Sequence, residues 1–188
     1  MLEIEMKFPV ADFQKVESKL RAWGASPKSP LQEADHYFNP PDRDFKTTDE
    51  ALRVRRIGTS SRVTYKGPRR QGPAKTRTEI EVGLAEGAAA AEDYCRLLVC
   101  LGYRPTAVVR KERIGYDLQR GGFDLEVCLD TVEQVGRFVE VEIVAPEEKL
   151  ASAQHVLQEV AGELGLEKPE RRSYLEMLLE KLGQDKRG

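Results

Sequence analysis

The sequence predicts an α+β fold in which a closed antiparallel β-barrel of about eight strands is covered on its outside by helices. Three observations predict it. Short segments alternate apolar and polar residues with a period of two, as half-buried strands do. Their polar faces consist mainly of Glu, Lys and Arg, with few Thr, Ser, Gln or Tyr. The segments between them carry apolar stripes at helical spacing, which need an apolar surface to cover.

The alternation is clearest between Leu2 and Phe8, where one face is apolar and the other carries Glu3, Glu5 and Lys7. We expect further strands at residues 33–38, 51–57, 62–66, 75–82, 105–119, 122–130 and 137–144. Apolar spacing with Gly or Pro at the boundaries predicts helices over residues 13–23, 86–101, 147–164 and 173–182. The sequence leaves open whether the last helix covers a barrel face or forms a contact in a homodimer.

The size and composition of the chain limit its class. Its 188 residues suit one domain, which we place at 1–182, with a C-terminal tail at 183–188. A net charge of −2 argues against a nucleic-acid partner, which would favour a basic excess. No apolar run reaches the length of a membrane span, and no signal peptide begins the chain, so we expect a cytoplasmic protein without a membrane partner. Three cysteines without a CxxC pair and only two histidines argue against a zinc site and a Ser-His-Asp triad.

The charged faces predict a ligand. Any one strand fits an ordinary sheet with a solvated face, but the repetition over six or seven strands favours charges that point into the barrel. Such an interior needs neutralising partners. The basic set is Lys7, Arg53, Arg55, Lys66, Lys75, Arg77, Lys111 and Arg113, and the acidic set is Glu3, Glu5, Asp130, Glu140 and Glu142. A polyphosphate with bound Mg²⁺ or Mn²⁺ satisfies both sets at once.

These residues and several ordered motifs resemble the CYTH domain, the family of class IV adenylyl cyclases, thiamine triphosphatases and related triphosphate tunnel enzymes. The hallmark Glu-x-Glu-x-Lys matches Glu3, Glu5 and Lys7. Further matching segments, similar to the cyclase branch, are Tyr37-Phe38, Thr48 to Arg53, Thr64 to Pro68, Lys75-Thr76-Arg77, Leu129-Asp130 and Phe138 to Glu142.

The resemblance implies roles for the matching residues. Glu3, Glu5, Glu140 and Glu142 would hold the metal, with Asp130 a further ligand or organiser. Lys7, Arg53, Arg55, Lys66, Arg77, Lys111 and Arg113 would bind the triphosphate, and Lys75 would do so near the nucleotide end. Among these, Glu5, Lys7, Lys75 and Arg113 would act in catalysis.

Three functions fit the sequence. The first is an adenylyl cyclase that converts ATP into cyclic AMP and pyrophosphate, and the cyclase-like motifs favour it. The second is a triphosphatase acting on inorganic triphosphate, thiamine triphosphate or a nucleoside triphosphate. The third is a non-catalytic polyphosphate-binding module, which the predicted metal carboxylates disfavour. The charged residues alone do not fix which phosphorus atom faces the nucleophile.

Overall fold

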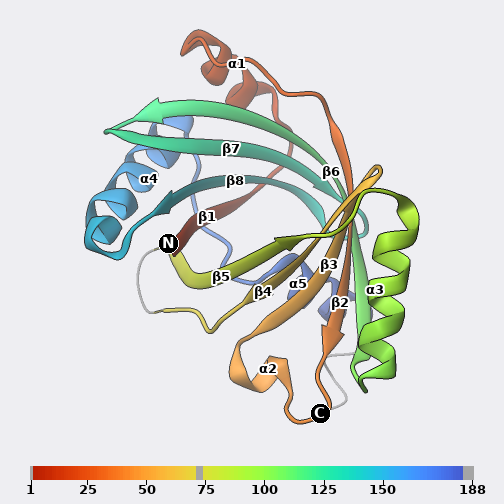
Figure 1. Cartoon of the computed structure of the whole chain (residues 1–188). Helices are drawn as coiled ribbons and strands as arrows, with labels where there is room; N and C mark the ends of the chain where they lie inside the picture. The colour runs from red at the N-terminus through yellow and green to blue at the C-terminus, as the bar shows by residue number, and fades with distance from the viewer. Residues whose placement is uncertain (1, 71–73, 184–188) are drawn as a thin grey trace.

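A computed structural model describes residues 2–70 and 74–183, and its centre is a closed barrel of eight antiparallel strands (Figure 1). The strands are β1 (Leu2–Val10), β2 (Leu31–Asn39), β3 (Ala51–Ile57), β4 (Ser60–Lys66), β5 (Lys75–Gly83), β6 (Arg104–Arg120), β7 (Phe123–Val132) and β8 (Gly136–Ala145). Their order around the barrel is β1-β5-β4-β3-β2-β6-β7-β8, and β8 pairs again with β1. The predicted fold class is confirmed.

Of the helices in the described part of the chain, three lie between strands, and the others follow β8. In chain order the helices are α1 (Gln14–Ala22), α2 (Phe45–Thr48), α3 (Ala88–Cys100), the 3₁₀ helix η1 (Glu147–Lys149), α4 (Leu150–Leu164) and α5 (Tyr174–Lys181). The four-residue helix α2 lies in a segment that the sequence predicts to be irregular. Asp44 begins it by accepting a hydrogen bond from the backbone N–H of Lys46.

The apolar faces of the strands point outwards and form the cores beneath the helices. The largest core joins the apolar face of β1 to α1 and α4, and includes Ile4, Leu20 and Leu157, which have no exposed surface. A second core packs α3 against β3 and β4 through Val54, Val63 and Leu98. Figure 1 shows α4 and α3 on opposite sides of the barrel. This arrangement leaves the charged faces of the strands inside.

Helix α5 differs from the other helices because it closes one end of the barrel. Tyr174, Met177 and Leu178 pack with Val109, Val132 and Phe138. Each of these three partners lies two residues away from an inward-facing residue of the same strand, and therefore faces inwards as well. The inward-facing residues are Lys111 on β6, Asp130 on β7 and Glu140 on β8. Helices therefore lie mostly outside the barrel, and α5, whose place the sequence left open, covers the end of the barrel, which offers a further apolar surface.

Among the described residues, no helix is both long enough and apolar enough to span a membrane. The predicted C-terminal tail lies outside the described residues, apart from Gly183.

Candidate active site: a charged tunnel

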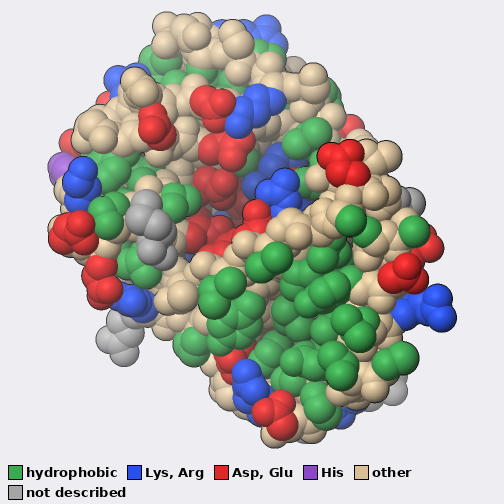
Figure 2. Space-filling model, in the orientation of Figure 1, with side chains coloured by type: hydrophobic (Ala, Val, Ile, Leu, Met, Phe, Trp, Pro, Cys, Tyr) green, Lys and Arg blue, Asp and Glu red, His purple; other side chains and the backbone are tan. Residues whose placement is uncertain are grey.

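A cavity of about 680 Å³ runs through the barrel and is lined by inward-facing side chains from all eight strands. Figure 2 looks into it and shows acidic and basic side chains gathered in its interior. This volume is typical of a small-molecule site. Every predicted site residue except Asp130 lines this cavity: Glu3, Glu5, Lys7, Arg53, Arg55, Lys66, Lys75, Arg77, Lys111, Arg113, Glu140 and Glu142.

Acidic and basic side chains that line the cavity pair with one another. Lys66 contacts Glu3 at 2.7 Å, and Lys75 contacts Glu5 at 3.0 Å. The register produces the second pair, because Glu5 and Lys75 are direct partners on β1 and β5. The sequence-based expectation of separate acidic and basic groups, each needing a ligand for neutrality, is thus corrected. Most of the lining is already neutralised in pairs.

Asp130 is fully buried and organises cations instead of facing the cavity. Arg113 grips it with two hydrogen bonds, Nε to Oδ1 at 2.7 Å and Nη2 to Oδ2 at 2.5 Å. Lys111 contacts Oδ2 at 3.2 Å, and Tyr174 donates its hydroxyl to the same oxygen at 2.9 Å. Burial would raise the pKa of Asp130, but Arg113 and Lys111 hold it well below its usual range. Of the two roles expected for Asp130, the contacts fit the organiser.

Two buried carboxylates on β2 were missing from the sequence-based site. Asp35 accepts two hydrogen bonds from Arg55, at 2.6 and 2.7 Å, and one from Arg53 at 3.3 Å. Glu33 contacts both Arg55, at 3.2 Å, and Lys111, at 3.3 Å. The period-two alternation on residues 33–38 already placed Glu33 and Asp35 on one face. That signal could have identified them as partners for the arginines of β3.

Three carboxylates form the group best suited to a divalent cation. Oxygen atoms of Glu3, Glu5 and Glu142 all lie within 4.8 Å of one another. No hydrogen bond or ion pair to Glu142 occurs among residues 2–70 and 74–183. Burial, with Glu140 and Glu5 nearby, raises the pKa of Glu142 to about 7. Glu3 and Glu5 each pair with a lysine, and Glu142 adds a third carboxylate beside them. Carboxylate oxygens from three side chains at this range fit the ligand chemistry of Mg²⁺ or Mn²⁺.

Comparison with known proteins now identifies the family. The model of the CYTH domain matches residues 1–174. This chain belongs to the CYTH domain family. It is 34% identical over 180 residues to a Methanocaldococcus jannaschii protein described as "Putative adenylate cyclase MJ0240", covering 94% of this chain and 98% of the relative.

Solved structures share the fold of this CYTH domain. The PH1819 protein of Pyrococcus horikoshii has a TM-score of 0.83 and 38% identity, with 95% of this chain and 99% of the other covered. A Hippeastrum protein described as "Putative adenylyl cyclase HpAC1", with a dominant triphosphatase activity, has a TM-score of 0.66 and 14% identity over 97% of this chain and 95% of the other. At that identity the likeness is one of fold.

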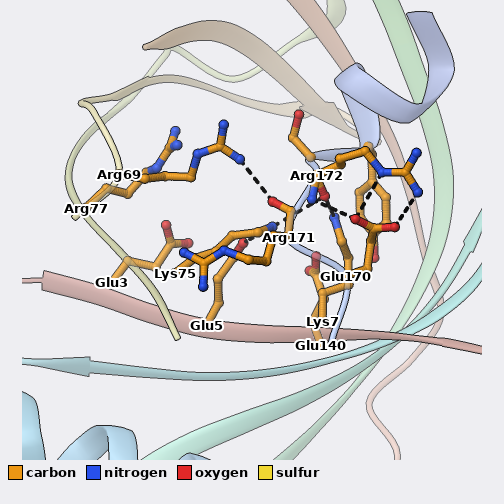
Figure 3. Close-up of polar contacts among 12 residues, drawn as sticks. Glu3, Glu5, Lys7, Arg69, Lys75, Arg77, Glu140, Glu170, Arg171 and Arg172 are labelled. Atoms are coloured by element: carbon orange, nitrogen blue, oxygen red, sulfur yellow. Dashed lines mark hydrogen bonds and ion pairs between the residues drawn. The ribbon is translucent and has the colours of Figure 1, made fainter. Parts of the chain in front are cut away.

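At the closed end of the CYTH barrel, two lysines converge on the chain that leads into α5. Lys7 Nζ donates to the backbone carbonyl of Arg172 at 2.5 Å, and Lys75 Nζ lies 3.5 Å from the same oxygen (Figure 3). The Tyr174 ring lies under Lys7, 4.1 Å from Nζ to the ring centre. Burial and the neighbouring Lys75 lower the pKa of Lys7 to about 8. Lys75, which the resemblance places near the nucleotide end, lies beside Lys7 at the closed end of the barrel.

A second acidic group adjoins the first and shares Glu142 with it. Its other members are Glu126 and the buried Cys128. Burial raises the pKa of the Cys128 thiol, and a thiol suits Mg²⁺ or Mn²⁺ less well than a carboxylate does, because these cations prefer oxygen ligands. Glu126 is also bound by Lys28 at 2.7 Å, and it lies where a side chain at Gly115 would stand. The Glu3, Glu5 and Glu142 group of this CYTH domain offers three carboxylates instead of two and a thiol, and is the better site for a hard cation.

Proposed function

We propose that this CYTH domain binds an organic triphosphate with a divalent cation in its tunnel and acts as a class IV-type adenylyl cyclase, converting ATP into cyclic AMP and pyrophosphate. The observation that carries the proposal is the carboxylate group of Glu3, Glu5 and Glu142 set among inward-facing lysines and arginines in one enclosed cavity. The description of the M. jannaschii relative, at 34% identity, supports the choice of a cyclase.

The basic side chains would bind the phosphate oxygens. Lys7 and Lys75 meet at one point of the cavity wall and present ammonium groups at the Arg172 carbonyl. Arg113 is held rigidly by Asp130, so its guanidinium is already oriented when a ligand arrives. Arg53 and Arg55 are oriented in the same way by Asp35. Lys66, Arg77 and Lys111 add positive charge along the same lining. Fixed charges of this kind lower the barrier of phosphoryl chemistry mainly through positioning and electrostatic stabilisation.

The cation would be Mg²⁺ or Mn²⁺, held by Glu3, Glu5 and Glu142 with Glu140 adjacent on β8. When bound, it supplies charge neutralisation at the phosphate oxygens. Glu140 is less available as a cation ligand, because its carboxylate forms an ion pair with Arg113. Burial would raise the pKa of Glu140, but Arg113 lowers it to about 2, so Glu140 stays ionised.

A triphosphatase is the second candidate. The same charged lining would hold inorganic triphosphate, thiamine triphosphate or a nucleoside triphosphate equally well. The fold is shared with HpAC1, which is described as having a dominant triphosphatase activity. That description belongs to a protein 14% identical to this chain, so the reaction has to be measured on this chain itself.

Product analysis tests the proposal. The purified protein is incubated with Mg²⁺ or Mn²⁺ and, in separate reactions, ATP, inorganic triphosphate and thiamine triphosphate. Cyclic AMP and pyrophosphate in equal amounts are the expected products from ATP. Orthophosphate without cyclic AMP would replace the cyclase by the triphosphatase. Tight binding without turnover of any of the three would favour the non-catalytic module.

A cytoplasmic protein without nucleic-acid or membrane partners, and with a possible homodimer, stays a prediction. The outer face of β5 offers one surface for self-association, since Ile80 and Val82 are both exposed there. Figure 2 shows apolar side chains gathered below the cavity opening. Light scattering coupled to size-exclusion chromatography would measure the oligomeric state.

A further inference from the structure

The two ends of the tunnel differ in the residues that surround them, and one end is closed while the other is open. At one end, α5 fills the barrel, and Tyr174 is only 8% exposed. Arg69 closes more of this end, because it contacts Asp49 at 2.6 Å and Glu176 at 3.1 Å. It also donates to the backbone carbonyl of Arg171, as Figure 3 shows. The chain itself therefore narrows this end with apolar packing and ion pairs.

The other end is open and has an apolar rim. Leu31, Ile57 and Val144 all line the cavity there. Leu31 begins β2, Ile57 ends β3 and Val144 lies near the end of β8, and the antiparallel order brings these three strand ends to the same side. Leu31 is 40% exposed and Val144 is 60% exposed. They are apolar side chains at the open end of inward faces whose middle parts carry charges.

Inward-facing residues change in character along the tunnel. On the paired strands β8 and β1, Val144 lies beside Glu3 at the open end. The next inward pair is Glu142 with Glu5, and the third is Glu140 with Lys7. From the opening inwards, the apolar side chain comes first, carboxylates occupy all three pairs, and the lysine comes last, over about 13 Å of strand.

From this gradient we propose that the substrate binds in one orientation, with its organic group against Leu31, Ile57 and Val144 and its terminal phosphate towards Lys7 and Lys75. The inference rests on the proposed triphosphate function and adds a specificity site to it. The ligand class is a triphosphate with a flat organic group, such as a nucleoside triphosphate. Such a group would cover apolar side chains that water now reaches.

Polar groups at the same opening complete the site. Arg62 also lines the cavity, on β4, the neighbour of the strand that carries Ile57. It forms an ion pair with Glu81 at 2.9 Å. A guanidinium paired with a carboxylate offers a planar surface for stacking together with donors and acceptors for a base edge. Inorganic triphosphate has no group that would use either feature.

Paired binding measurements test the orientation. The double variant Leu31→Ser/Val144→Ser is compared with Ile80→Ser, which removes a 57% exposed apolar side chain from the outer face of β5. Calorimetry then gives dissociation constants for ATP and for inorganic triphosphate, each with Mg²⁺. We expect the double variant to bind ATP about tenfold more weakly and inorganic triphosphate within about twofold of wild type. Ile80→Ser should match wild type with both ligands.

Equal weakening of both ligands in the double variant, or unchanged ATP binding, would overturn the proposed orientation. Unfolding temperatures of all variants identify any loss through misfolding, and the single variant Val144→Ser, at the more exposed position, then replaces the double one. Binding is measured separately from turnover, so the two proposals can fail independently. If the wild type turns over no ATP but the double variant loses affinity for ATP alone, the proposed reaction is refuted and the proposed orientation is supported. If the wild type binds neither ATP nor inorganic triphosphate, both the proposed function and the proposed orientation are overturned.

Discussion

The hydroxyl of Tyr174 donates a hydrogen bond to Oδ2 of Asp130 at 2.9 Å, and both side chains are buried. Asp130 lies on the inward face of β7, while Tyr174 begins α5 after a loop of the C-terminal segment. The same oxygen of Asp130 accepts from Arg113 and contacts Lys111. One carboxylate therefore joins the helix that closes the barrel to two cations of the tunnel lining.

Substitution of Tyr174 should separate its two contacts. Tyr174→Phe keeps the ring under Lys7 but removes one hydrogen bond from Asp130. We expect the free energy of unfolding to fall by about 1–2 kcal/mol, because a buried acceptor loses a partner. Tyr174→Leu also removes the ring and should cost about 3 kcal/mol. Urea unfolding measures both losses. A Tyr174→Phe variant as stable as wild type would show that the hydroxyl contributes nothing, and equal losses in the two variants would show that the ring contributes nothing.

Asp35 should stabilise the fold in a pH-dependent way. Burial would raise its pKa, but Arg53 and Arg55 hold that pKa below its usual range. A depressed folded-state pKa contributes stability above the unfolded-state pKa of about 4, and this contribution declines as the pH falls below it. We expect Asp35→Asn to lose about 3 kcal/mol at pH 7, since two buried guanidinium groups lose their counter-charge. The gap from wild type should narrow below about pH 4, which urea unfolding across pH would measure.

A matched control is available for Asp35→Asn. Asp117→Asn removes a carboxylate that pairs with Lys28 at 2.6 Å but is 72% exposed. Exposed pairs contribute less than about 1 kcal/mol. Comparable losses in both variants, or a gap at Asp35 that does not change with pH, would contradict the role assigned to the buried pair.

Glu142 and Glu126 should differ in cation binding. Glu142 belongs to the group with Glu3 and Glu5, whereas Glu126 is already bound by Lys28. Glu142→Gln should weaken Mn²⁺ binding at least about tenfold, as loss of a direct ligand costs no less than loss of an outer contact. Glu126→Gln should change it little. Titration of Mn²⁺ by electron paramagnetic resonance gives both constants. A loss of affinity in Glu126→Gln as large as that in Glu142→Gln would move the ion to the second acidic group, which also contains Glu142.

Gly115 should be needed for the position of Glu126. A Cβ atom at Gly115 would come within 2.4 Å of the Oε1 atom of Glu126. Because that atom ends a flexible side chain, Gly115→Ala should displace the carboxylate and weaken its contact with Lys28. We expect a stability loss of less than about 1 kcal/mol, since the pair is partly exposed. Urea unfolding measures the loss, and the additional effect of Gly115→Ala in a Glu126→Ala background, which has no long side chain to displace, should be close to zero.

The inward set of side chains follows from the sequence for a local reason. Period two assigns every second residue of a strand to one face, so Glu3, Glu5 and Lys7 share a face whatever their neighbours are. Repetition of charged faces then predicts the barrel, because only a closed sheet with helices outside buries all the apolar faces. On β6, four charged residues follow one another at positions 110–113, so alternation alone does not decide which of them point inwards. The structure buries Lys111 and exposes Arg110 and Glu112.

The tertiary structure alone decided which charges meet, and the reason is that strand register is a property of pairs of segments far apart in the chain. The sequence by itself determined the barrel, its charged interior and the acidic and basic residues that line it. It did not place Lys75 beside Glu5, Asp35 beside Arg55, or Asp130 among cations. Nor did it place α5, since an apolar helical stripe fits a barrel end as well as a barrel side. Closure of one end by Tyr174 and the apolar rim at the other give the tunnel its direction.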